Sequence, residues 1–344
     1  MLSYFSGVQG GEHRIILQLF AFIESAIHDN EIMIAKNKMN PIIQGENYSN
    51  QPVAGALCVL GATVVFSILG ALVKVVSSSL NNEMVVFFRN ICSLIFILPW
   101  LAYSRPSGGI KTNCLRLHLF RSAAGLGAMY CFFYAIAHLR LSEAFLLAST
   151  SPLFIPLIAY VWMREEVTYS AKGAIIAGFI GIVLILKPGF GIFRPAMLVA
   201  LATGVLVALA MVTIRRMSFS EPAMRIVFYF TIFSTVISAG PLFWSWRSPV
   251  PEIWWLLILI GLLAAVGQFF LTKGYSMAPA AQVGPLSYGN VVFATIIGWI
   301  YWGETMDMLT WAGAFLVCMA GIITTRRTEA HVLVDAAVGK TPDP

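Results

Sequence analysis

The chain has 344 residues, of which 58% are hydrophobic and 11% are charged. An ordinary soluble domain carries about 25% charged residues, so this composition excludes intrinsic disorder and most water-soluble folds. The mean hydropathy of +0.81 leaves apolar side chains on every face of the helices, as expected where lipid replaces water as the solvent. These numbers predict an all-α integral membrane protein.

The charge and the cysteines exclude two further classes of protein. The net charge is +6, but the 22 lysines and arginines form no run longer than Arg215-Arg216 or Arg326-Arg327, so nucleic acid is not an expected partner. The five cysteines lack CxxC spacing, and four of them lie in apolar segments. We expect them to be packing residues, and we predict no disulfide framework, metal site or cofactor.

Ten apolar stretches follow one another through most of the chain, each of about the 20 residues that cross a hydrocarbon core of ~30 Å. Short polar connections separate them, so consecutive helices are expected to be antiparallel neighbours in one bundle. The predicted transmembrane helices are 53–74, 84–103, 119–138, 143–163, 172–187, 195–214, 224–244, 253–273, 280–302 and 310–325.

The lysines and arginines are divided unequally between the two sides of this predicted bundle. If both termini are cytoplasmic, 16 of the 22 lie on the cytoplasmic side, Arg121 among them, 5 lie outside, and Arg89 lies within the second helix. This bias follows the positive-inside rule. It predicts a multi-pass protein of the cytoplasmic (inner) membrane with both termini in the cytoplasm. Four tryptophans at one predicted outer turn are expected interface anchors: Trp244, Trp246, Trp254 and Trp255.

The two ends of the chain lie outside the predicted bundle. Residues 1–50 form a polar to weakly amphipathic extension, and translation from Met33 or Met39 would explain why it lacks a spanning helix or a cleavable signal. The intact mass of the native protein distinguishes the two start sites from Met1. Residues 328–344 are polar and are expected to be disordered.

An internal repeat relates the two halves of the chain. Sliding the sequence by 139 positions aligns identical residues in the fourth and ninth helices, namely Leu147 with Leu286, Phe154 with Phe293, Ile158 with Ile297 and Glu165 with Glu304. The repeats, 53–187 and 195–326, each contain five predicted helices. Because five is odd, the second repeat enters the membrane from the opposite side. Such inverted repeats commonly build secondary transporters that work by alternating access.

The ends of the fourth and ninth helices carry the most specific motifs: Leu141-Ser-Glu-Ala, Ser151-Pro-Leu-Phe, Trp162-Met-Arg-Glu, Met277-Ala-Pro-Ala-Ala and Trp302-Gly-Glu. With them, residues 53–326 resemble the ten-helix EamA branch of the drug/metabolite transporter superfamily. The sequence departs from the family's usual Gly-Glu at Arg164-Glu165 and lacks the usual proline before the fourth helix. Other motifs look like the subgroup that includes S-adenosylmethionine uptake transporters: Phe87-Phe-Arg89, Leu186-Lys-Pro188 and Phe228-Tyr229.

Arg89 is the sharpest candidate for substrate binding. It lies about six residues into the second helix, roughly 9 Å below the surface, where an arginine costs a few kcal/mol unless it faces protein or water. Its planar guanidinium could hold a carboxylate with two hydrogen bonds. The alternatives are that it extends towards the surface or pairs with Glu83 or Glu143.

Polar residues and prolines recur in the fourth and ninth helices. Ser149, Pro152 and Pro156 share one face of the fourth helix, and prolines there free backbone carbonyls that a cavity or neighbouring side chains must satisfy. This favours a gated helix, although a packing kink remains open. The corresponding candidates are Ser151 in the fourth helix and Pro285, Tyr288 and Asn290 in the ninth.

Three further residues are candidates for the wall of a substrate cavity. Tyr130 and Tyr134 share a face of the third helix, although aromatic pairs at this spacing more often serve packing. Gln268 lies near the middle of the eighth helix, where its amide needs a partner.

Glu165 and Glu304 lie at the C-terminal ends of their helices, where the helix dipole disfavours a negative charge. We therefore expect each to pair with a basic residue, and we assign both to structure and gating.

The sequence lacks a GxxxxGK[ST] loop and a catalytic cluster, so neither an ATP-driven pump nor an enzyme is expected. Our prediction is a secondary transporter of a small polar metabolite, amino-acid-like or carboxylate-bearing. Glu143 remains open as a protonation site. The substrate and the lipid bilayer are the expected partners, and a homodimer stays open. The alternatives are a dedicated S-adenosylmethionine carrier, a channel, and an integral-membrane enzyme acting on lipid-linked substrates.

Overall fold

The computed structural model describes residues 52–104, 111–112, 114–163, 169–187, 194–217, 220–221, 223–277 and 284–338. The predictions for residues 1–50 and Glu165, and those for the side chain of Pro285, lie outside this description.

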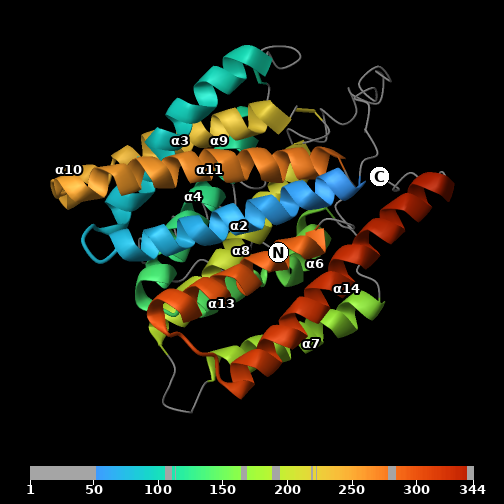
Figure 1. Ribbon diagram of the computed structural model, residues 1–344. Helices are drawn as coiled ribbons and strands as arrows, with labels where there is room; N and C mark the ends of the chain where they lie inside the picture. The colour runs from blue at the N-terminus through green and yellow to red at the C-terminus, as the bar shows by residue number, and fades with distance from the viewer. Residues whose placement is uncertain are drawn as a thin grey trace, which may run out of the picture. The chain divides into compact units, whose positions relative to one another are not determined.

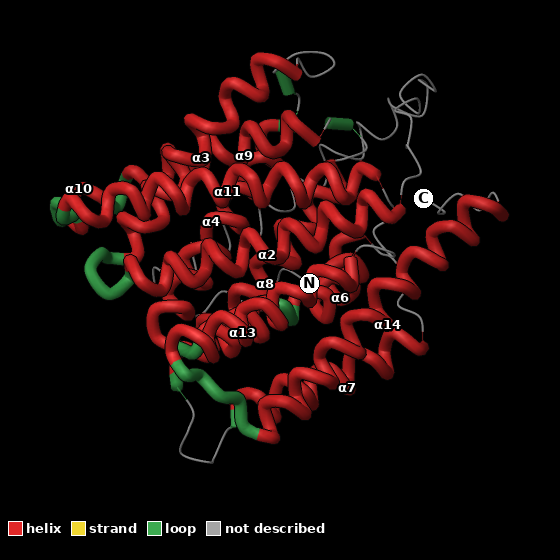
Figure 2. The backbone as a smooth tube through the Cα atoms, viewed as in Figure 1, coloured by secondary structure: helices red, strands yellow, loops and turns green. Residues whose placement is uncertain are grey.

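The described residues form helices joined by short connections, and no strand occurs among them (Figure 2). Long apolar runs favour this, because a helix satisfies its backbone hydrogen bonds internally where lipid offers none. Their bounds are α2 (Pro52–Val76), α3 (Asn82–Ser104), α4 (Leu115–His138), α5 (Leu141–Ala148), α6 (Ser151–Met163), α7 (Tyr169–Leu186), α8 (Pro195–Met217), α9 (Ala223–Ala239), α10 (Leu242–Ser245), α11 (Pro251–Met277), the 3-10 helix η2 (Gly284–Tyr288), α13 (Gly289–Trp302) and α14 (Met308–Val338) (Figure 1).

Several of these helices have the length and apolar composition of membrane-spanning helices. Six spans are long and apolar enough to cross a membrane, with α5 and α6 together forming one of them, and three shorter apolar helices accompany them. Large apolar side chains remain exposed along the helices, for example Val161 (80%) and Ile176 (64%). The four tryptophans expected at an interface, in α10, α11 and the intervening segment, are exposed as well. The prediction of an all-α, multi-pass chain is confirmed for the described residues.

The predicted fourth helix is two helices, α5 and α6, separated at Ser149 and Thr150. Proline at 152 has no N–H to donate to the preceding turn, so the backbone turns before α6 begins. Thr150 Oγ1 donates to the Leu147 carbonyl oxygen (2.6 Å) at the break. The predicted ninth helix also changes its winding, from η2 to α13, at Tyr288. Ser149 and Tyr288 are 139 positions apart, the offset of the sequence repeat.

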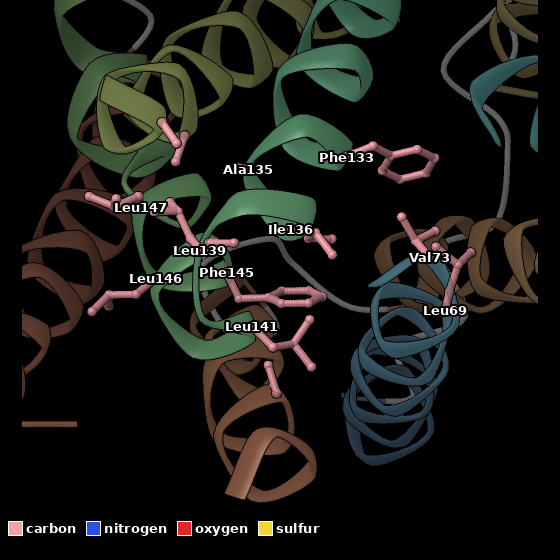
Figure 3. Close-up of a cluster of buried hydrophobic side chains, with 14 of the residues drawn as sticks. Leu69, Val73, Phe133, Ala135, Ile136, Leu139, Leu141, Phe145, Leu146 and Leu147 are labelled. Atoms are coloured by element: carbon pink, nitrogen blue, oxygen red, sulfur yellow. The ribbon is translucent and has the colours of Figure 1, made fainter. Parts of the chain in front are cut away.

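The apolar core includes the packing of α2 against α4 and α5 (Figure 3). Ile136 of α4 and Phe145 of α5 point towards Val73 and Leu69 of α2 in this view. Gly70 permits the approach, because a Cβ atom there would lie 2.6 Å from the Phe145 ring. This packing fixes the ends of α2 and α5 that carry the polar contacts described below.

A second close approach joins α7 and α14, which run side by side (Figure 1). A Cβ atom on Gly181 would lie 2.8 Å from the Gly313 carbonyl oxygen, and one on Gly313 would lie 2.6 Å from that of Gly181. The sequence predicts helix contact along Gly173, Ala177 and Gly181. Gly173 does not take part, because nothing lies within 4 Å of a Cβ atom built there.

We expect Gly181→Ala to lower the thermal unfolding temperature measurably, since overpacking against backbone costs about 1–3 kcal/mol. Gly173→Ala is the matched control on the same helix, and it should leave the unfolding temperature unchanged or slightly raised. Thermal unfolding of the two purified variants in detergent tests this. Equal unfolding temperatures for both would contradict the backbone contact.

The last helix is longer than predicted. α14 continues to Val338, so residues 328–338 of the predicted disordered tail are helical, and residues 339–344 lie outside the described part. The sequence offers a reason, because no glycine or proline occurs between Gly321 and Gly339 and alanines and leucine favour helix there.

Candidate functional site

Arg89 lies seven residues after the start of α3, about 10 Å along the helix, and is only 7% exposed. Its Nη1 donates to Asn90 Oδ1 (2.9 Å). Among the described residues it makes no ion pair with Glu83 or Glu143, and Glu143 lies 3.9 Å from Arg140. A buried guanidinium whose hydrogen-bonding partner is a neutral amide keeps donors for an anion.

Arg121 lies inside the bundle as well, which the sequence analysis did not recognise. It was counted among the cytoplasmic charges because the third helix was expected to begin at residue 119, whereas α4 begins at Leu115. Its Nε and Nη1 atoms are buried without a hydrogen-bond partner. The guanidinium lies over the ring of Phe230 in α9, 3.8 Å from the ring centroid.

The two arginines belong to helices that pack together, because α3, α4 and α9 contact one another. Two positive charges within one packed group of helices repel each other. Ser234 lies one turn after Phe230 on α9, fully buried, and its hydroxyl has no hydrogen-bond partner. Arg89, Arg121, Phe230 and Ser234, together with Asn90, define what we call the arginine site.

The candidates of the fourth helix lie elsewhere, at the break between α5 and α6. Ser149 ends α5 and Ser151 begins α6, and both are half-buried. α8 packs against this break at Gly204, where a Cβ atom would collide with Thr150 Oγ1 and lie 3.2 Å from the Leu147 carbonyl oxygen. Within α6, Pro156 is buried and Pro152 is half-buried.

The candidates of the ninth helix face two neighbours. Ser67 Oγ of α2 donates to the Asn290 carbonyl oxygen (3.2 Å), while the Asn290 side-chain oxygen is buried without a partner. The Tyr288 hydroxyl is also buried without a partner and lies against Gly321 of α14. In the described part of the chain, no hydrogen bond or ion pair joins Arg89 to the candidates of the fourth or ninth helix.

The remaining predicted wall residues differ in burial. Tyr130 is half-buried, and its hydroxyl has no hydrogen-bond partner. Tyr134 is 39% exposed and stacks on His138 with 4.1 Å between ring centroids, an arrangement typical of an interface aromatic. Gln268 is half-buried in α11, the helix that packs against α2 and α3.

A polar cluster joins the start of α4 to the connection between α8 and α9. Glu221 accepts hydrogen bonds from Thr112 Oγ1 (2.5 Å) and Arg225 Nη1 (2.6 Å). His118 lies 4.0 Å from Glu221 and packs against Tyr229, and its ring is fully buried. Among the described residues, no group of three or more His, Cys, Asp or Glu side chains is arranged to hold a metal ion.

A second polar cluster surrounds Glu304, and we call it the Glu304 tie. Gly303 ends α13 with φ +62°, a conformation that suits glycine, and the chain turns back so that Glu304 N–H donates to the Gly298 carbonyl oxygen (3.1 Å). The Glu304 carboxylate pairs with Lys74 of α2 and accepts from the Leu141 N–H at the start of α5 (2.8 Å).

A neighbouring ion pair joins the same connection to the end of α7. Lys187 donates to Asp307, and this hydrogen bond lowers the pKa of the Asp307 carboxyl to about 2. Arg140 also donates to the Thr305 carbonyl oxygen. The connection between α13 and α14 is thus held by residues from α2, α5 and the end of α7.

Comparison with known proteins places this arrangement in a family. The EamA-like transporter family matches the chain twice, over residues 53–187 and 194–326. A pseudopaline exporter of Pseudomonas aeruginosa is 33% identical over 79% of this chain and 96% of its own length. A riboflavin transporter of Vibrio cholerae is 25% identical, covering 80% and 94%, and an S-adenosylmethionine uptake transporter of Rickettsia bellii is 26% identical, covering 72% and 89%.

A solved crystal structure shares the fold, with a TM-score of 0.56 at 19% sequence identity over 80% of this chain and 99% of the other. The curated relatives are transporters and not enzymes, so the alternative of a membrane enzyme is wrong. The chain is a multi-pass membrane transporter of the drug/metabolite transporter superfamily, and it belongs to the EamA-like transporter family.

Proposed function

We propose that this chain is a secondary transporter that moves a small polar, carboxylate-bearing metabolite across the cytoplasmic membrane by alternating access. The observation that carries the proposal is Arg89, which is 7% exposed in a membrane-spanning helix and has no acidic partner among the described residues. A charge in that position is costly unless it faces water or pairs with another group, and a planar guanidinium matches a carboxylate with two hydrogen bonds.

The proposed architecture is ten transmembrane helices in two inverted repeats of five. Two observations support this architecture. The chain matches one family twice, and the helices are interrupted at Ser149 and again at Tyr288, 139 positions later. Discontinuous helices in corresponding positions commonly mark the substrate pathway of inverted-repeat transporters. We therefore retain Ser149, Ser151 and Asn290 as pathway residues, with the prolines beside them as gating positions.

In the proposed orientation both termini are cytoplasmic and the membrane is the inner one. The excess of lysine and arginine on one side supports this orientation. The cluster around Glu221 is then cytoplasmic, and the Glu304 tie is on the outer side.

A narrower candidate is an S-adenosylmethionine carrier. The R. bellii relative at 26% identity supports it, and this molecule carries the carboxylate that Arg89 would bind. Two other relatives are named for different solutes, riboflavin and pseudopaline. We therefore propose the broader class of carboxylate-bearing solutes for this chain.

Counterflow in proteoliposomes tests transport by alternating access. Thermal-shift screening of amino acids, nucleosides and S-adenosylmethionine selects the probe, and vesicles preloaded with the unlabelled probe should take up the labelled compound faster than empty vesicles. This acceleration arises because a loaded carrier returns across the membrane faster. Uptake that is indifferent to internal solute would indicate a channel and overturn the proposal.

A further inference from the structure

Arg121 brings a second positive charge into the bundle, which the proposed function leaves unused. None of the ion pairs among the described residues includes it, and its Nε and Nη1 atoms are buried without a hydrogen-bond partner. Buried donors are normally satisfied, and a charge inside a membrane protein normally pairs or faces water. These two donors therefore lack the acceptor that their burial requires.

The direction of the Arg121 side chain excludes simple extension to the membrane surface. Arginine near the end of a spanning helix ordinarily extends outward to the interface, and helical side chains lean towards the N-terminus of their helix. Arg121 instead reaches one turn in the C-terminal direction, where its Nη1 lies 2.5 Å from the position of a Cβ atom on Gly125. This places the guanidinium about 15 Å along the 24-residue α4, near its middle.

The surroundings hold the guanidinium in this place. The missing side chain of Gly125 provides the space, since a Cβ atom there would also lie 2.8 Å from the Phe230 ring. The Phe230 ring supports one face of the guanidinium and leaves its edge, where the N–H donors lie, for another partner.

One carboxylate does not neutralise the positive charges of both Arg89 and Arg121. Both positive charges lie in one packed group of helices, and Arg89 is hydrogen-bonded to a neutral amide. Two cations that repel in a poorly solvated interior bind an anion of matching charge more strongly than an anion of single charge.

We infer that Arg89 and Arg121 form one binding site for a solute with two anionic groups, a dicarboxylate, with one carboxylate on each guanidinium. This inference rests on the proposed function, because it takes Arg89 as the first carboxylate site. It adds the substrate class, which is a dianion. The guanidinium that binds the second carboxylate is that of Arg121, which is held between Gly125 and Phe230.

The test compares matched acids on the full-length protein in detergent. Binding of the dicarboxylates from malonate to adipate, and of the monocarboxylates of equal chain length, is measured by calorimetry. The wild type should bind its best dicarboxylate roughly 10- to 100-fold more tightly than the matching monocarboxylate, the effect of one further charge-assisted contact. Arg121→Gln should lower dicarboxylate affinity roughly 10- to 100-fold and monocarboxylate affinity by less, so that the preference is lost. Arg116→Gln, an exposed arginine on the same helix, should retain the preference.

Gly125→Ala provides a second variant that does not depend on removing the charge. The added methyl group displaces Arg121 Nη1, so the preference for dicarboxylates should fall although both arginines remain. If Arg121→Gln and Gly125→Ala both keep the wild-type preference, the inference is overturned while carboxylate transport through Arg89 stands. If the wild type binds neither class of acid but binds an amino acid or S-adenosylmethionine, the inference fails and the proposed function stands. If it binds none of these compounds, both fail.

Discussion

Arg89→Gln is expected to abolish carboxylate uptake in proteoliposomes while the protein still folds. The substitution removes a charge-assisted contact worth about 1.5–3 kcal/mol, which corresponds to a loss of roughly 10- to 100-fold in affinity. Folding should survive, because in the described part of the chain Arg89 has no acidic partner that would be left buried and unpaired. Uptake of labelled probe and thermal unfolding of the same preparation measure the two effects separately.

The controls for Arg89 separate charge from geometry. Arg89→Lys keeps the positive charge but not the planar pair of donors, so we expect it to transport more slowly than wild type and faster than Arg89→Gln. Arg247→Gln removes an exposed arginine and should transport normally. Wild-type uptake by Arg89→Gln would show that the substrate carboxylate is bound elsewhere and would remove Arg89 from the site.

Hydrophobic runs made the helices predictable, because length and apolarity suffice to specify a spanning helix. The same patterns could not locate the interruptions. The fourth and seventh helices were expected to be continuous, whereas the structure has α5 and α6 in one place and α9 and α10 in the other. Prolines signal where an interruption is permitted, but tertiary contacts such as Gly204 against Thr150 decide where the backbone turns.

The arginine site shows which part of a site a linear sequence reveals. Arg89 was recognised because it lies well inside an apolar stretch. Arg121 lies close to the end of one, where an arginine ordinarily extends to the surface, and only the position of its guanidinium beside Gly125 reveals the opposite direction. The sequence does contain a signal, since Gly125 lies one turn after Arg121, but a glycine in a membrane helix usually serves helix packing.

The second large effect is expected at the Glu304 tie. Glu304→Ala leaves Lys74 without its acidic partner, with the Leu139 carbonyl oxygen (3.1 Å) as its remaining acceptor, and leaves the Leu141 N–H without its acceptor. Removing one partner of a buried ion pair costs about 3–5 kcal/mol. The side chains of Lys74 and Glu304 are 16% and 9% exposed, so solvent screens this pair little. Thermal unfolding of the purified variant should therefore show a large fall in the unfolding temperature.

A matched pair of variants compares this tie with a partly exposed ion pair. Asp307→Asn breaks the neighbouring contact between Lys187, which is 7% exposed, and Asp307, which is 46% exposed, so solvent reaches the carboxylate and screens this pair more than the Glu304 tie. Its effect on the unfolding temperature should be smaller than that of Glu304→Ala. In a double-mutant cycle, Lys74→Met combined with Glu304→Ala should cost less than the sum of the single changes, because each single change leaves a buried charge that the double change removes. Additive costs would show that Lys74 and Glu304 stabilise the fold independently, and the Glu304 tie would then have no role as a joint between the end of α13 and α2.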